Sequence, residues 1–264
     1  MSKFSKWVAK HHTLCNILAL IAGIAVLVLL KWAGIHPVLA FVLYFVSIFL
    51  LMWMTNLIVL YPMIKLSASV GDSNDPYPLL EVCEFLQSCK LGNQIKTIAL
   101  VNYSAMLRNI GRYYQAQEIL TSIDPKKLPN PKVNKFVYYN NLADICFLLG
   151  ELDEGSSWYE KTKEAYAEIP LKIRNNLRSN FFASLESQQA YCQKNYQKVL
   201  DELSKADETK LVHKIDNSIL RAKAYVALGR TDEAKRELNF VIENGNKLYA
   251  VTEAKKLLKE LENE

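Results

Sequence analysis

The chain has 264 residues, half of them hydrophobic, and a formal net charge of +5. Residues 1–60 contain no Asp or Glu and carry Lys3, Lys6, Lys10 and Lys31, whereas the rest holds 28 of the 32 basic residues and all 27 acidic ones. Because that remainder is nearly neutral and lacks the clustered Lys and Arg that phosphate binding requires, we expect no nucleic-acid partner.

Two apolar runs follow a short basic N-terminal segment, residues 1–13. The run over 14–30 is uncharged and would form a helix about 25 Å long, close to the roughly 30 Å thickness of a hydrocarbon core. The run over 38–60 would be about 34 Å long and could span with some tilt. We therefore predict a transmembrane hairpin over 14–62. The alternative, two buried helices of a soluble protein, would require a modest domain to cover both on every face.

The short connection over 31–37 requires an antiparallel hairpin, so both chain ends lie on the same side of the bilayer. Lys3, Lys6 and Lys10 precede the first run, and Lys31 alone lies in the connection. The positive-inside rule then predicts a multi-pass protein of the cell membrane, with its N-terminus and C-terminal part in the cytoplasm. A cleaved signal peptide would also begin with basic residues, but no clear A-x-A site follows the first run.

Residues 63–78 are rich in Ser, Gly, Asp, Asn and Pro, which predicts a short linker. Residues 79–264 show helical spacing of apolar residues, and four segments within them align with one another. The segments open on a small residue, at Ser104, Ala143, Ser187 and Ala222. Seven positions later comes a turn residue, at Gly111, Gly150, Lys194 and Gly229. A small or β-branched residue follows, at Ala116, Gly155, Val199 and Ala234, and a bulky one closes each unit, at Leu120, Tyr159, Leu203 and Leu238.

This pattern predicts a helix, a glycine-type cap and a second helix that approaches the first closely. The sequences GRYYQA at 111–116 and LGRTDEA at 228–234 make the array resemble the tetratricopeptide repeat family over residues 98–245. The resemblance implies an all-α fold, in which the transmembrane hairpin precedes an α-solenoid of about four helix–turn–helix repeats. Terminal capping helices are expected over 79–91 and 247–262.

In that family the first helix of each repeat lines a concave groove that holds a peptide or a partner helix. The matching positions here are Asn102, Ala105 and Arg108, then Asn140, Asn141 and Asp144, then Gln188 and Tyr191, and finally Lys223. We favour Asn102, Asn140 and Asn141 as binding residues, because an amide side chain offers both a donor and an acceptor to a peptide backbone.

Sequence patterns typical of catalysis are lacking: there is no phosphate-binding glycine loop, nucleophile elbow or paired-cysteine metal motif. We therefore expect no enzyme, no cofactor and no metal site, although His11 and His12 leave a metal site open as an alternative. Cys83 and Cys89 are six residues apart, which is too far for zinc-knuckle spacing, and we interpret them as core thiols.

Three functional hypotheses remain. The first is a membrane-anchored scaffold or adaptor that recruits a protein or peptide to the cytoplasmic face of the membrane, within a membrane complex or a homo-oligomer. The second is a membrane-tethered regulator that senses a peptide. The third is an accessory subunit of a membrane transport complex.

Overall fold

The computed structural model describes residues 1–174, 181–206 and 208–263, and every regular element there is helical. The expected all-α class is confirmed. In chain order the helices are α1 (Lys3–Lys10), α2 (His12–Trp32), α3 (Pro37–Ser73), α4 (Tyr77–Ser88), α5 (Asn93–Asn109), α6 (Tyr113–Thr121), the 3-10 helix η1 (Pro125–Lys127), α7 (Pro131–Leu148), α8 (Leu152–Ala167), α9 (Leu171–Arg174), α10 (Phe181–Cys192), α11 (Tyr196–Leu203), α12 (Leu211–Ala227), α13 (Thr231–Asn244) and α14 (Tyr249–Glu262).

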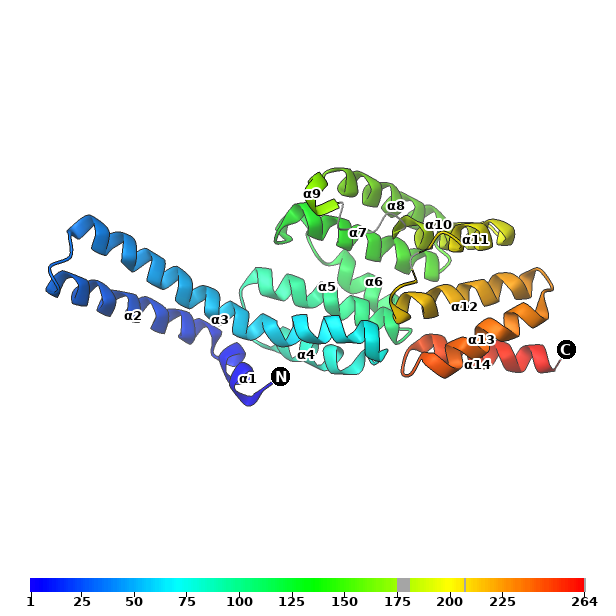
Figure 1. Cartoon of the computed structure of the whole chain (residues 1–264), viewed down its shortest axis with the longest axis horizontal. Helices are drawn as coiled ribbons and strands as arrows, with labels where there is room; N and C mark the ends of the chain where they lie inside the picture. Colours follow the sequence, from blue (N-terminus) through cyan, green and yellow to red (C-terminus); the bar gives the residue numbers. More distant parts are fainter. Residues whose placement is uncertain (175–180, 207, 264) are drawn as a thin grey trace.

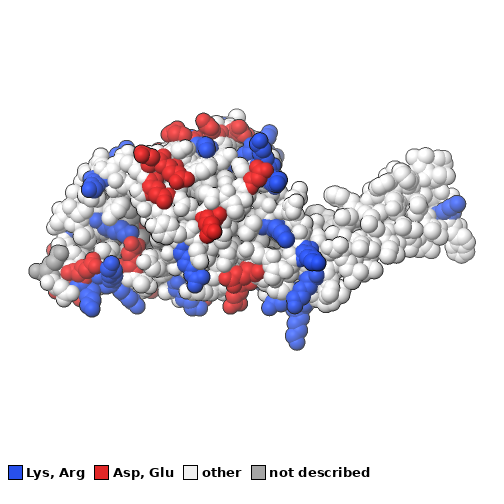
Figure 2. All heavy atoms as spheres, turned by 180° about the vertical axis from the view of Figure 1, so that it is seen from behind, with Lys and Arg blue, Asp and Glu red and all other residues white. Residues whose placement is uncertain are grey.

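Helix α2 and the first part of α3 form an antiparallel hairpin that projects from the other helices (Figure 1). Both are long and apolar enough to cross a membrane, and only 11% and 17% of their most apolar windows are buried. On the face that Figure 2 shows, the hairpin is almost free of charged residues, whereas both signs are interspersed over the rest. A Cβ atom at Gly23 would lie 2.4 Å from Cγ1 of Ile48, so the two helices approach closely at a residue without a side chain.

Helix α3 is longer than the predicted span, and the linker expected over 63–78 is wrong for most of its length. The helix continues through Pro62 and ends at Ser73. Composition favoured a loop, because Gly, Ser and Asp are weak helix formers. Packing overrides that preference, since Met63 and Val70 are buried in the largest hydrophobic cluster of the molecule.

Four helix–turn–helix units follow, namely α5–α6, α7–α8, α10–α11 and α12–α13. The four predicted turn residues all have positive φ, 80° at Gly111, 79° at Gly150, 59° at Lys194 and 71° at Gly229. In each turn this residue donates its N–H to the carbonyl three positions earlier, and the next residue donates to the carbonyl five positions earlier. This pair of bonds is the Schellman motif that ends a helix. The positions predicted for the four turns are thus confirmed.

The small residues of the repeat pattern are buried in all four units. On the first helices these are Ser104, Ala143, Ser187 and Ala222, and on the second helices Ala116, Gly155, Val199 and Ala234. The closing bulky positions are also buried, at Leu120, Tyr159, Leu203 and Leu238.

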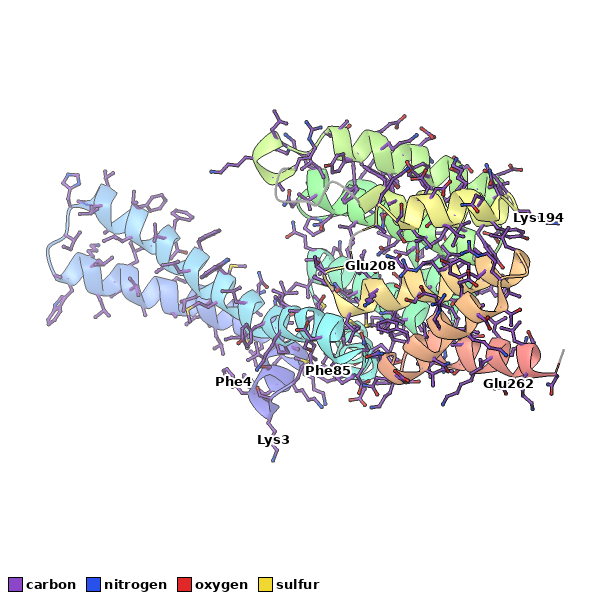
Figure 3. All side chains as sticks on the ribbon, turned by 45° about the vertical axis from the view of Figure 1, so that its right-hand side comes forward. Lys3, Phe4, Phe85, Lys194, Glu208 and Glu262 are labelled. Carbon is purple, nitrogen blue, oxygen red and sulfur yellow. The ribbon has the colours of Figure 1, made fainter. Side chains whose placement is uncertain are left out.

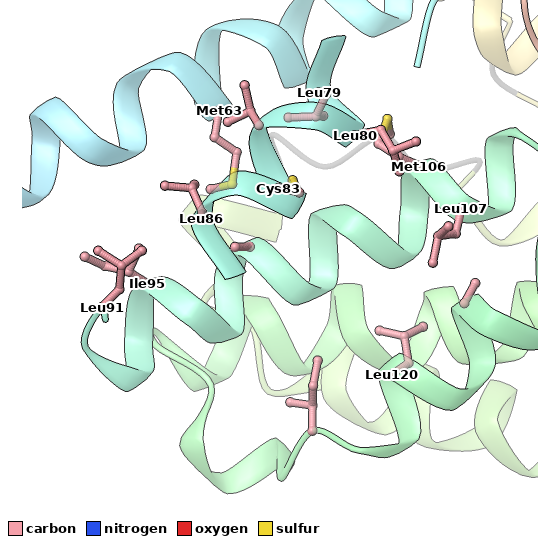
Figure 4. Packing of buried hydrophobic residues seen from close by; sticks show 14 of the residues in the cluster. Met63, Leu79, Leu80, Cys83, Leu86, Leu91, Ile95, Met106, Leu107 and Leu120 are labelled. Carbon is pink, nitrogen blue, oxygen red and sulfur yellow. The ribbon is translucent and has the colours of Figure 1, made fainter. Parts of the chain in front are cut away.

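The largest hydrophobic cluster extends from the base of the hairpin into the helical array, which we define as α4 to α14. Figure 4 shows Met63 of α3 beside Cys83 and Leu86 of α4. Cys83 and Cys89 are 0% and 5% exposed, which confirms that they are core thiols. Because α4 packs against both α3 and α5, the array is joined to the membrane-type hairpin through a shared core.

Candidate functional site

Helices α3, α5, α7, α10 and α12 line a cavity of about 510 Å³. This volume lies within the range of roughly 300–1,000 Å³ that is typical of ligand sites. Five of the predicted groove residues line this cavity, namely Ala105, Arg108, Asn140, Asn141 and Asp144. The first helices of the first two units therefore meet at one cavity.

Arg108 is the centre of an ion-pair network on one wall of the cavity. Its Nε atom lies 2.9 Å from Oδ2 of Asp144, and its Nη1 atom lies 2.8 Å from Oδ2 of Asp216. Nε2 of Gln188 donates to Oδ1 of Asp144 over 2.7 Å. Burial alone would lower the pKa of Arg108, but the two carboxylates outweigh it and raise that pKa well above the ordinary value. The guanidinium donors that were expected to face a partner are thus used to join α5, α7 and α12.

Asn140 and Asn141 are the polar residues of the cavity best placed to bind a ligand. Both side chains are partly buried on α7. Within the described part of the chain, Oδ1 of Asn140 is enclosed and has no hydrogen-bond partner. An enclosed acceptor without a partner costs about 1–3 kcal/mol, which a ligand N–H group could recover.

The other predicted residues lie outside this cavity. Nδ2 of Asn102 donates to the carbonyl of Ile98 in its own helix over 2.9 Å. The ring of Tyr191 packs edge-on against Tyr196. Nζ of Lys223 pairs with Oε1 of Glu253 at 2.7 Å. Gln188 and Lys223 line a second, much smaller cavity of about 40 Å³ beside Arg108.

Sequence reasoning missed two walls of the cavity. Helix α3 contributes Ser67, Val70 and Gly71, which had been assigned to the linker. Helix α12 and its N-cap contribute several residues that the sequence had not assigned to the groove: Lys210 at the N-cap, Val212, His213, Asp216 and Asn217. The four-residue spacing of Leu211, Ile215 and Ile219 was the signal that could have placed the start of α12 correctly.

The charges that line the cavity balance, because Arg108 and Lys210 face Asp144 and Asp216. The remaining polar lining consists mainly of Asn and Ser side chains, beside apolar residues such as Met106. Amide and hydroxyl groups in a balanced field suit a neutral, hydrogen-bonding ligand such as a peptide backbone.

Among the described residues, the group that could hold a metal ion is a weaker candidate site than the cavity. Cys146, Glu151 and Glu154 have ligand atoms within 4.8 Å of one another, but burial raises the pKa of Cys146 to about 12. A protonated thiol is a poor ligand, and the amide of Gln117 already donates to Glu151. Of the two histidines considered for a metal, His12 already has a partner, because its Nε2 forms a hydrogen bond with Oδ1 of Asn56 over 2.8 Å.

Comparison with protein-family models, with curated proteins and with solved structures finds no match to this chain.

Proposed function

We propose that the chain is a membrane-anchored adaptor that recruits a protein partner to the cytoplasmic face of the cell membrane. The exposure of the apolar hairpin supports the anchor, because the core helix of a soluble protein would be mostly buried. Three lysines before α2 and only Lys31 near the opposite end support a cytoplasmic array.

We further propose that the array is an α-solenoid of the tetratricopeptide type. The four units share their turn geometry and their small buried residues, which supports a repeat in which each unit packs on the next. In such an array the first helices line the groove, and α5, α7, α10 and α12 are the first helices here.

The cavity on these four first helices is the observation that carries the proposal. The partner would contribute an extended segment whose backbone N–H groups bond the enclosed oxygen of Asn140, and Asn141 would bind from the next position on α7. The apolar part of the lining would receive a side chain of that segment.

The test places a photo-activatable amino acid at Asn141 of the full-length chain in its native membranes. We expect an adduct of one discrete added mass, identified by mass spectrometry. Asn140→Leu, which keeps the size of the side chain and removes its amide, should lower the yield about five- to tenfold, the factor for a typical hydrogen bond. The matched control has the photo-activatable residue at Glu243, which is exposed on α13 outside the cavity.

We expect no such adduct from Glu243. An equal yield from Glu243, no adduct from Asn141, or a yield that Asn140→Leu leaves unchanged would each argue against a partner held in the cavity.

A second function, a regulator that senses a peptide, is favoured by one specific observation. Ser67, Val70 and Gly71 of the cavity belong to α3, which continues from the hairpin without interruption. A bound segment would touch the membrane helix itself. Spin labels on α3 at Lys65 and on α14 at Lys255 distinguish the two: an adaptor keeps the distance between the labels when the partner is bound, and a sensor changes it.

A further inference from the structure

Helix α1 lies at the junction of the hairpin and the array, and one side of it is fixed to both. Val8 and Ala9 are 4% and 0% exposed and belong to the same hydrophobic cluster as Met63 of α3. The ammonium groups of Lys6 and Lys10 lie 5.7 and 6.0 Å from the ring centroid of Phe85 on α4. The orientation of α1 is therefore set by packing.

The other side of α1 exposes large aromatic side chains beside lysines. Phe4 and Trp7 are 61% and 49% exposed. Figure 3 shows Lys3 and Phe4 projecting from α1 away from the array. Exposed aromatic rings next to basic residues, at the foot of an apolar hairpin, are typical of helices that lie in the interface of a bilayer.

Helix α1 itself carries charge of one sign. It has three lysines and no acidic residue, and a further lysine, Lys96, lies in the first turn of α5. Burial raises the pKa of the Cys89 thiol, and the positive charges of Lys10 and Lys96 partly oppose that shift. Both lysines are therefore close enough to Cys89 to act on the same group. None of the four lysines forms an ion pair with the residues that the structure describes.

We propose that α1 and Lys96 form a binding surface for anionic phospholipid headgroups. Phe4 and Trp7 lie at the boundary between headgroups and acyl chains, and Lys3, Lys6, Lys10 and Lys96 contact the phosphate and carboxylate groups of anionic lipids. The source of the anion is the bilayer and not a soluble ligand, because α1 packs against the base of the apolar hairpin. This inference rests on the membrane anchoring proposed above.

Each lysine near an anionic surface favours binding by about fivefold, which corresponds to roughly 1 kcal/mol. Removal of the three α1 lysines therefore abolishes most of the preference for anionic over zwitterionic lipid. The attraction is also screened by salt, because these side chains lie at the water boundary.

The experiment uses the full-length chain reconstituted in phosphatidylcholine bilayers with spin-labelled phosphatidylserine or spin-labelled phosphatidylcholine as probe. The spectrum measures the fraction of probe lipid immobilised by the protein. We expect phosphatidylserine to be immobilised preferentially, and the preference to approach unity in the triple variant Lys3→Gln, Lys6→Gln, Lys10→Gln and at high salt.

The matched control is Lys255→Gln, Lys256→Gln, Lys259→Gln on α14, which removes the same charge from exposed positions far from the hairpin. It should keep the preference, and so should the triple replacement of the α1 lysines by Arg. If the α1 variant keeps the preference, or the α14 variant loses it equally, the lipid surface is overturned. If no probe of either kind is immobilised, the membrane anchor itself is wrong, so the two failures are distinguishable.

Discussion

At the scale of single residues, Arg108 shows how a predicted binding residue becomes a structural one. The sequence placed it in the groove, and it does line the cavity, but its side chain is only 17% exposed and is held by Asp144 and Asp216. Asp216 is more than a hundred residues away in the chain, and nothing in the local pattern indicates such a partner. Asn140 and Asn141, which the resemblance to tetratricopeptide repeats placed in the groove, line the same cavity, and their role in binding stays a prediction.

Arg108→Met leaves two carboxylates partly buried without their partner. We expect it to destabilise the protein by about 3–5 kcal/mol, the usual cost of breaking a buried ion pair. The measurement is denaturant unfolding of the full-length chain in detergent, followed by circular dichroism. Arg230→Met is the control, since Arg230 pairs with Glu233 at the surface and its replacement should cost little stability. Equal losses of unfolding free energy in the two variants would show that the Arg108 network stabilises the protein no more than a surface ion pair does.

Buried thiols predict a loss of stability in alkali. Burial raises the pKa of Cys83 and of Cys146 from 9.0 to about 12. As the pH rises, the unfolded chain therefore loses these protons before the folded protein does. The thiols leave the free energy of unfolding unchanged below pH 9 and lower it from about pH 9 to 12, by up to about 1.4 kcal/mol per pH unit and thiol. Unfolding free energies measured between pH 8 and 11 check this slope. The variant Cys83→Ala, Cys146→Ala should fall more gently over that range, and identical slopes would refute the assignment.

At the scale of elements, the turns were predictable and the long helix was not. A turn needs only a residue that tolerates left-handed φ a fixed distance into the repeat, and this information is local. The end of α3 depends on packing against α4, α5 and α12, and of these α12 is distant in sequence. The boundary of a helix with a poor intrinsic propensity is therefore visible only in the folded molecule.

Lys194 is the one turn residue of the four that is not glycine, although its φ is 59°. Lys194→Gly should stabilise the protein by about 0.5–1 kcal/mol, because relief of about 1–2 kcal/mol of left-handed strain exceeds the added entropy of the unfolded chain. The matched reverse change is Gly150→Lys, where a Cβ atom meets open space and only the backbone conformation is affected. It should destabilise by a similar amount in the same unfolding assay. Changes of the same sign in the two variants would refute the equivalence of the two turns.

At the scale of the whole molecule, the last turn of α3 is tied to the far end of the array by what we call the end clamp. Nδ2 of Asn74 donates to the carbonyl of Asn244 over 2.9 Å, and the Asn74 carbonyl accepts from the N–H of Lys247. Nζ of Lys247 also lies 2.6 Å from Oδ2 of Asp75. These contacts join residues about 170 positions apart, so no sequence pattern could have revealed them.

Asn74→Gly removes the side chain of the end clamp and preserves the left-handed backbone, whose φ is 51°. We expect the amides of residues 66–73 to exchange with deuterium about five- to thirtyfold faster, as the loss of roughly 1–2 kcal/mol of local hydrogen bonding predicts. The control is Asn130→Gly, since Asn130 has a φ of 44° and its side chain makes no capping bond. An end clamp at this position would be contradicted if residues 66–73 exchanged faster in the control, or if Asn74→Gly left their exchange rates unchanged.

The continuity of α3 matters to anyone who would cut the chain to obtain a water-soluble domain. A fragment that begins at Pro76 keeps all four repeats, yet it loses the side of the cavity that Ser67, Val70 and Gly71 provide. It also uncovers the apolar surface of α4 that Met63 covers in the intact protein. Such a fragment would self-associate and carry an altered pocket, so a test of the proposed partner belongs on the complete molecule.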